Sequence, residues 1–308
     1  MTTSEPQQSP FLRLPFELRL QIYEYLLLPS STPAPTHSTS IDNLSPQHPY
    51  YTPDPTSSPT TLTVRTIDPS LPHHAPSPKR RLRTTYHIRT GPFQTHTTPT
   101  TYTLPLPPTL SHLHHTIPSL LPLSRQIHTE ASSLLYSTYT FSFDTAIEAI
   151  VPFLSDLTPV ARASLRYVQI TKKPLPYVSE FDRAEWACAC RYLGGTQGLR
   201  LQRVALHVVG GRPGVGGWEG VEAVSAGQLR VLARVRGDSG RGGAIGGVDL
   251  EWVEQVMGIK GLRDVDVRAV VEHCPPPRSE TMAFWVAFSR SIEGGFADWV
   301  RGEMVAKG

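Results

Sequence analysis

Cysteine is scarce in this sequence. Only three of the 308 residues are cysteine, at Cys188, Cys190 and Cys274. So few thiols, in an odd number, cannot form the disulfide framework on which small secreted domains depend. The first ten residues are polar and contain no basic segment followed by an apolar one, so they do not resemble a secretory signal. Both absences favour an intracellular protein, either cytoplasmic or nuclear.

Long apolar runs and a strong net charge are also missing. The longest apolar stretches, such as residues 282–288, are far shorter than the roughly 20 residues that a membrane-spanning helix needs. The formal net charge of +3 is too small to attract nucleic acid or an anionic membrane in bulk. We therefore expect neither a nucleic acid nor a membrane among the partners.

Proline, by contrast, is abundant. Most of the 30 prolines fall between residues 29 and 116, together with many threonines, serines and histidines. Proline removes a backbone donor and disfavours helix at the residue before it, and few side chains here could offset the entropy of ordering the chain. The composition predicts a disordered Pro/Ser/Thr-rich insertion over 29–116, with at most one hairpin formed by 62–67 and 84–89.

Two amphipathic helices are expected on either side of this insertion. The first covers residues 14–28, where Pro15 suits the first turn and the apolar residues recur at helical spacing. The second covers residues 119–138 and has its own apolar stripe, which includes Ile127. Neither helix can bury its stripe alone, so we expect the second to pack on the first, with Ile22 and Ile127 facing one core. The stripe of the first helix comprises Leu14, Leu18, Ile22, Tyr25 and Leu26.

The rest of the chain, 117–308, is predicted to be an α/β domain. After the second helix, three irregular units each join a helix to a short run that alternates apolar and polar residues, as a half-buried strand does. Helices between strands indicate parallel pairing and a small sheet. A last helix over 279–305 is expected to break at Gly294-Gly295, and the glycine-rich stretches 209–220 and 237–247 are expected to be loops.

No motif indicates catalysis or a bound cofactor. The glycine-rich stretch 210–220 matches neither the dinucleotide-binding nor the P-loop pattern. Cys188 and Cys190 are separated by one residue, whereas zinc sites use two to four. We find no nucleophile elbow and no paired carboxylates. We therefore expect no cofactor, no metal and no small-molecule ligand, and an enzyme with an unrecognised site is the least favoured alternative.

One basic cluster lies inside the proline-rich insertion. Lys79, Arg80, Arg81 and Arg83 follow the sequence Pro-Ser-Pro. In an exposed segment such a cluster is accessible to a nuclear import receptor. The alternative is an ordinary solvated charge run that increases solubility.

The two expected helices resemble a known family. The segments "LPFELRLQIYEYLLLP" (14–29) and "LLPLSRQIHTEASSLLYSTYTF" (120–141) resemble the F-box-like proteins of filamentous fungi, most of which are grouped as domains of unknown function. That family has an L-P-x-E-L-R-x-x-I-Y-x-x-L-L opening and a later L-x-x-x-C-R-Q-I-x-x-E-A-x-x-L-L-Y-x-x-N-x-F segment. The chain departs from the later segment at Ser124, where Cys is usual, and at Tyr139, where Asn is usual.

The resemblance implies a protein-interaction function. In true F-boxes the Leu-Pro opening helps to bind the linker protein Skp1, which joins a substrate receptor to a cullin ubiquitin ligase. Carried onto this chain, the contact residues are Leu14, Pro15, Glu17 and Leu18 of an F-box-like first helix over 10–28. The expectation is a non-catalytic substrate adaptor with a Skp1-type linker and an unknown protein substrate as partners. The alternative is a scaffold protein in which this helix serves only the core.

Overall fold

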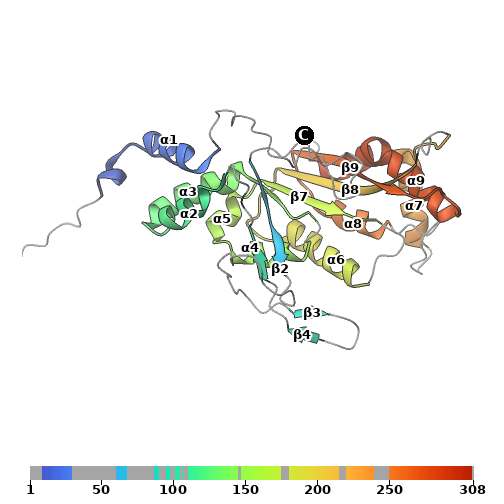
Figure 1. Cartoon of the computed structure of the whole chain (residues 1–308), viewed down its shortest axis with the longest axis horizontal. Coiled ribbons are helices and arrows are strands. Elements are labelled where there is room, and N and C mark those ends of the chain that lie inside the picture. Colours follow the sequence, from blue (N-terminus) through green and yellow to red (C-terminus); the bar gives the residue numbers. More distant parts are fainter. Residues whose placement is uncertain are drawn as a thin grey trace, which may run out of the picture.

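The computed structural model describes residues 9–29, 60–67, 87–89, 95–97, 101–104, 106, 110–144, 147–174, 180–214, 220–238 and 250–306. In Figure 1 a group of helices near the N-terminus lies at one end of the molecule, beside a larger part built around a sheet. The predicted α/β class is therefore confirmed.

The main sheet has five strands, and every neighbouring pair is parallel. Its order is β1-β6-β7-β8-β9, so β1 and β9 form the edges. The parallel pairing follows from the helices that separate β6, β7, β8 and β9 along the chain, as the sequence indicated. The strands span Thr61–Thr63 (β1), Thr140–Ser142 (β6), Tyr167–Lys172 (β7), Arg203–Pro213 (β8) and Asp264–Cys274 (β9).

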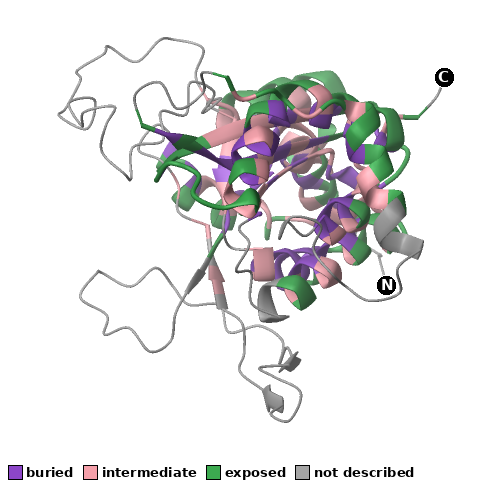
Figure 2. Cartoon of the chain, turned by 90° about the vertical axis from the view of Figure 1, so that its right-hand side faces the viewer, coloured by how far each residue is buried: buried purple, intermediate pink, exposed green. Residues whose placement is uncertain are grey.

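One face of this sheet is apolar and covered by helices. A single register row crosses all five strands, and each of its side chains is at most 2% exposed. Helix α4 (Ile150–Asp156) packs on this face through Phe153, and α6 (Glu180–Gly195) packs on it through Trp186, which contacts Lys172. Figure 2 shows buried residues on the inner sides of these layers and exposed residues around them. The row comprises Leu62, Phe141, Val168, Val204 and Val265.

The N-terminal helices form a separate layer at the end of the molecule. A 3-10 turn η1 (Pro10–Arg13) leads into α1 (Phe16–Leu27), which packs against α2 (Leu113–Leu120) and α3 (Arg125–Thr138). Helix α3 also packs on α5 (Pro159–Ser164) and so connects this layer to the sheet. The expected packing of the second predicted helix on the first is confirmed.

The predicted continuous helix over 119–138 is wrong. The chain turns after Leu120, and α3 begins only at Arg125, where the Ser124 hydroxyl accepts a hydrogen bond from the backbone N–H of Ile127. Pro122 explains the interruption, since it has no backbone N–H with which to continue the helical hydrogen bonds. The serine cap then starts a new helix.

The C-terminal helices enclose the other end of the sheet. They are α7 (Ala226–Asp238), α8 (Glu251–Met257), α9 (Glu280–Ser291), a π-type turn η4 (Ile292–Phe296) and α10 (Ala297–Met304). Gly294 has non-helical backbone angles inside η4 (φ −108°, ψ −111°), so the expected break at the glycine pair is confirmed. Trp252, Phe288, Phe296 and Trp299 form a buried aromatic cluster between these helices.

The expectation of a loop over 209–220 is wrong for its first residues. Residues 209–213 belong to β8. An added Cβ at Gly211 would lie 2.1 Å from the Trp285 ring, and one at Gly210 would lie 3.0 Å from Ile292. Glycine is therefore needed here for the close approach of α9 to the strand, which a sequence pattern does not distinguish from loop glycines.

Part of the predicted insertion belongs to the folded structure. β1 is an edge strand of the main sheet, and Leu62 and Val64 are buried. β2 (Arg65–Ile67) pairs antiparallel with β5 (Thr101–Thr103), and β3 (His87–Arg89) pairs with β4 (Thr95–Thr97). The predicted pairing of 62–67 with 84–89 is therefore wrong. Residues 30–59 and 68–86 lie outside the described residues, so their predicted disorder stays a prediction.

Candidate functional site

The candidate site is the outward side of α1. The helix begins directly after Pro15, which occupies the N-cap position with extended backbone angles. Glu17 lies in the first turn and is exposed, where its charge complements the positive end of the helix dipole. Leu28 follows the last helical residue and is extended.

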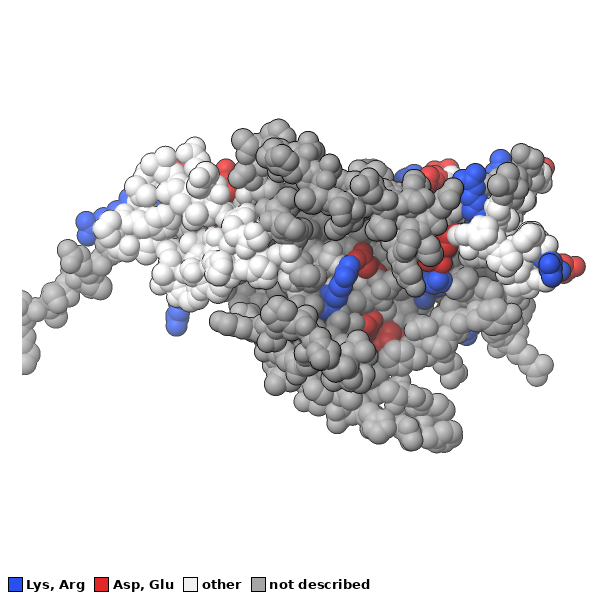
Figure 3. All heavy atoms as spheres, viewed as in Figure 1, with Lys and Arg blue, Asp and Glu red and all other residues white. Residues whose placement is uncertain are grey.

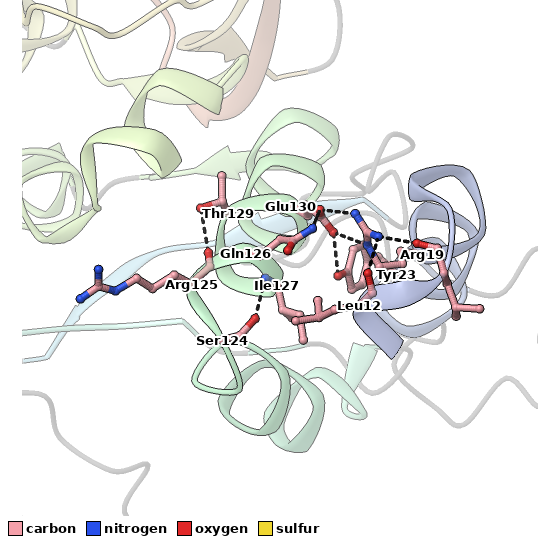
Figure 4. A network of polar contacts seen from close by, with 10 residues as sticks. Leu12, Arg19, Tyr23, Ser124, Arg125, Gln126, Ile127, Thr129 and Glu130 are labelled. Carbon is pink, nitrogen blue, oxygen red and sulfur yellow. Dashed lines mark hydrogen bonds and ion pairs between the residues drawn. The ribbon is translucent and has the colours of Figure 1, made fainter. Parts of the chain in front are cut away.

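An ion pair fixes α1 to α3. The Arg19 guanidinium donates two hydrogen bonds to the carboxylate of Glu130, with Nη2–Oε1 at 2.7 Å and Nε–Oε2 at 3.0 Å (Figure 4). The side chains of Arg19 and Glu130 are only 8% and 15% exposed. Tyr23, one turn along α1, donates its hydroxyl to Glu130 Oε2 at 2.9 Å. This network, Arg19–Tyr23–Glu130, is called the clamp below.

The clamp also holds the chain that precedes α1. Nη1 of Arg19 donates to the backbone carbonyl oxygen of Leu14 at 2.5 Å and lies 3.4 Å from that of Leu12. The ring of Phe11 packs edge-on against Tyr23 with centroids 5.8 Å apart. One arginine therefore sets both the orientation of α1 on α3 and the position of the Leu14-Pro15 segment.

The clamp perturbs the protonation of its members. The hydrogen bonds from Arg19 lower the pKa of Glu130 to about 2, with Gln126 and Tyr23 contributing further. Burial, together with the hydrogen bond to Glu130, raises the pKa of Tyr23 to about 12. The carboxylate is therefore ionised, and the phenol protonated, across the physiological range.

The far end of α1 is held by a second contact. The buried hydroxyl of Tyr139 donates to the carbonyl oxygen of Leu27 at 2.6 Å. Tyr139 follows α3 and is fully buried, which raises the pKa of its phenol to about 12. Because α1 is held near its start and at its last residue, its orientation is fixed. This orientation determines which side of the helix faces the core and which side faces solvent.

The outward face of α1 is apolar. Leu18, Ile22 and Tyr25 are 46%, 36% and 84% exposed, and their i, i+4, i+7 spacing places them on one stripe. The expected burial of Ile22 is therefore wrong, whereas that of Ile127 is confirmed at 6% exposure. In Figure 3 the described surface over α1–α3 carries few charged side chains, and these lie toward its margins.

The stripe faces outward because α1 uses a different side for its own packing. The residues that face α3 are Arg19, Tyr23 and Leu27, which are all buried. The clamp neutralises the charge of Arg19, and burial of Tyr23 and Leu27 supplies apolar contact. A pattern of apolar positions alone predicts the opposite orientation, because it assigns an arginine to solvent.

The predicted contact residues lie close together at the start of α1. Leu14 is half-buried, while Pro15, Glu17 and Leu18 are exposed. They continue into the apolar stripe through Leu18. The basic residues Lys79, Arg80, Arg81 and Arg83 lie outside the described residues, so the predicted import signal stays a prediction.

Sequence reasoning missed the clamp. The available signal was that Arg19 and Glu130 carry opposite charges inside the two segments that resemble one family, "LPFELR" and "RQIHTEA". A buried ion pair between two helices expected to pack together would account for both residues.

The three cysteines form no disulfide, and burial raises the pKa of Cys190 to about 12, which keeps its thiol protonated. The part of the chain that the structure describes contains no group of three or more residues that could hold a metal ion.

Comparison with protein-family models, with curated proteins and with solved structures gives no match to this chain. Within the described residues, no helix has both the length and the apolar composition needed to cross a membrane.

Proposed function

We propose that this protein is a non-catalytic adaptor that binds other proteins, and that α1 is its docking helix for a Skp1-type linker. The observation that carries the proposal is the uncovered apolar stripe of Leu18, Ile22 and Tyr25 next to Leu14 and Pro15. Amphipathic helices bind partner grooves through anchors at this spacing. The resemblance of residues 14–29 to an F-box opening supports the choice of linker.

The clamp supports this proposal in a second way. A docking helix loses less conformational entropy on binding when it is already rigid in the free protein. Arg19 and Tyr139 hold α1 near its two ends, and Arg19 also holds the carbonyl oxygen of Leu14. The linker could therefore bind the stripe without any rearrangement of the core, and no buried residue would have to move on binding.

The proposed setting is intracellular, in the cytoplasm or the nucleus, where cysteines that form no disulfide remain reduced. A protein substrate would be held elsewhere on the chain and presented to the ligase through α1. The scaffold alternative predicts that α1 binds no linker.

Co-purification with a Skp1-type linker tests the proposal. Wild-type protein should capture the linker, and the double variants Leu14→Ala/Pro15→Ala and Leu18→Ala/Ile22→Ala should each lose capture. Anchors of this kind contribute about 2 kcal/mol or more each on truncation. The control is Val231→Ala, which removes an exposed apolar side chain from α7 and should capture the linker normally.

The melting temperatures of the variants separate docking from folding. Leu18→Ala/Ile22→Ala should melt close to wild type, because both side chains are already exposed. A wild-type protein that captures no linker would rule out the adaptor and leave the scaffold. If the variants lose capture only because they unfold, the stripe residues belong to the core and do not form a docking surface.

A further inference from the structure

Part of the second face of the main sheet is polar. Where β7 lies beside β8 and β9, its side chains stand in three register rows, and none of them is buried. Farther along β8, Val209 is buried and α9 packs on Gly211. All-parallel sheets are normally covered on both faces, so exposed side chains over the three rows are unusual for the architecture. The rows are Tyr167–Arg203–Asp264, Gln169–Ala205–Asp266 and Thr171–His207–Arg268.

A shallow hollow of about 150 Å³ lies on this face. Its lining is mostly polar and includes Thr140 and Tyr167 from the β6–β7 side and His207, Asp266 and Arg268 from the β8–β9 side. All of its lining residues belong to strands of the main sheet. The hollow has room for one side-chain group but not for a whole cofactor.

The charges in the hollow are arranged with the cations outermost. The carboxylate of Asp266 accepts from Nη2 of Arg203 and from Nε of Arg268, each at 3.0 Å. The side chain of Asp266 is 19% exposed, whereas those of Arg203 and Arg268 are 45% and 39% exposed. Arg203 makes a second ion pair with Asp264, at the rim.

Both arginines keep unused donors. Among the described residues no acceptor lies within hydrogen-bond distance of Nη1 or Nη2 of Arg268, or of Nη1 of Arg203. The two nitrogens of Arg268 form an edge that matches a carboxylate bidentately. Asp266 and the rim carboxylate of Asp264 together balance the charges of the two arginines, so the attraction for an anion comes from the unused Nη1–Nη2 edge of Arg268. A single carboxylate fits that edge with one negative charge, whereas a phosphate monoester would bring about −1.5 to −2 into a balanced cluster.

We propose that this face binds an acidic, extended segment of a protein partner, with one Asp or Glu carboxylate entering the hollow to contact Arg268 and Arg203. The three rows offer hydrogen-bonding side chains on both sides of the hollow for the neighbouring residues of the segment. The inference goes beyond the docking of α1 and does not depend on it. In an adaptor, this face would select substrates by an acidic sequence.

Fluorescence anisotropy with two labelled octapeptides tests the proposal. One peptide repeats Ser-Glu four times and the other repeats Ser-Gln, and both are titrated with the full-length protein at low salt. The glutamate peptide should bind at least about tenfold more tightly, since the contact is charge-assisted. Arg268→Gln should weaken its binding by a similar factor. The charge-matched control is Arg191→Gln, at an exposed residue of α6, which should leave binding unchanged.

A variant that should bind more tightly distinguishes an effect on binding from a folding defect. Asp264→Asn removes a rim carboxylate that repels the peptide but leaves both arginines bound to Asp266, so affinity should rise severalfold. Equal binding of both peptides, or equal losses in Arg268→Gln and Arg191→Gln, would overturn the proposal. Tighter binding of a single-stranded oligonucleotide of equal charge would also overturn it.

One further outcome assigns the face to the chain itself. The segment 30–59 contains Asp42 and Asp54 and no Lys or Arg. If the glutamate peptide bound only after both aspartates were changed to asparagine, the occupant would be this segment, and the proposed partner would be wrong. Linker capture by α1 is measured separately, so either proposal can fail alone.

Discussion

Glu130→Gln is the most informative perturbation of the clamp. The substitution keeps the size of the side chain and removes its charge, so that Arg19, 8% exposed, loses its counterion. The pKa of Glu130 is lowered from 4.5 to about 2, and this difference corresponds to about 3 kcal/mol at roughly 1.4 kcal/mol per pKa unit. Removing one partner of a buried ion pair costs about 3–5 kcal/mol, which agrees. We expect the free energy of unfolding to fall by about 3 kcal/mol at pH 7.

The same reasoning predicts how this loss depends on pH. Because the pKa of Glu130 is lower in the folded chain than in the unfolded chain, the ion pair stabilises fully above about pH 4.5 and is lost as the pH falls toward 2. The stability difference between wild type and Glu130→Gln should therefore be constant from pH 7 to about pH 5 and should close at lower pH.

Urea denaturation, followed by circular dichroism over this pH range, measures both effects. Glu24→Gln is the control, because Glu24 is exposed on the same helix and its substitution should change stability by less than about 0.5 kcal/mol. If Glu130→Gln changes the free energy of unfolding at pH 7 as little as this control does, the clamp does not stabilise the fold. A large difference that persists unchanged at pH 2 would show that the loss is steric and not electrostatic.

Three further predictions concern the core, the sheet and the insertion. Ile127→Ala should destabilise the fold by about 2–5 kcal/mol, whereas Ile22→Ala should cost less than about 1 kcal/mol; thermal melting compares them, and equal losses would contradict the orientation of α1. Gly211→Ala should cost about 1–3 kcal/mol or more, because its methyl group would overlap the Trp285 ring; urea denaturation measures this, and Gly195→Ala, with open space around it, is the matched control. Replacing the four basic residues of 79–83 with alanine should move a tagged protein out of the nucleus under fluorescence microscopy, and an unchanged distribution would leave only a solvated charge run.

Local patterns in the sequence were enough to predict the α/β class of the fold. Alternating apolar residues predicted β7 and the first parts of β8 and β9, because the period of a strand is visible over a few residues. The break at Gly294-Gly295 was also predicted, and the predicted start of the first helix at Leu14 lies two residues before the observed start at Phe16, since glycine and proline act on their own backbone. The apolar stripe of α1 was identified correctly as a stripe.

Only the tertiary structure decided which way that stripe faces. Arg19 points inward because Glu130, 111 residues away, neutralises it there, and no local period carries this information. The same holds for β1, which was assigned to the insertion until its pairing with β6 placed Leu62 in the core. The open face of β7–β9 likewise depends on where the helices pack. Long-range contacts determine what an amphipathic element turns toward solvent, and in this protein both proposed docking surfaces follow from that choice.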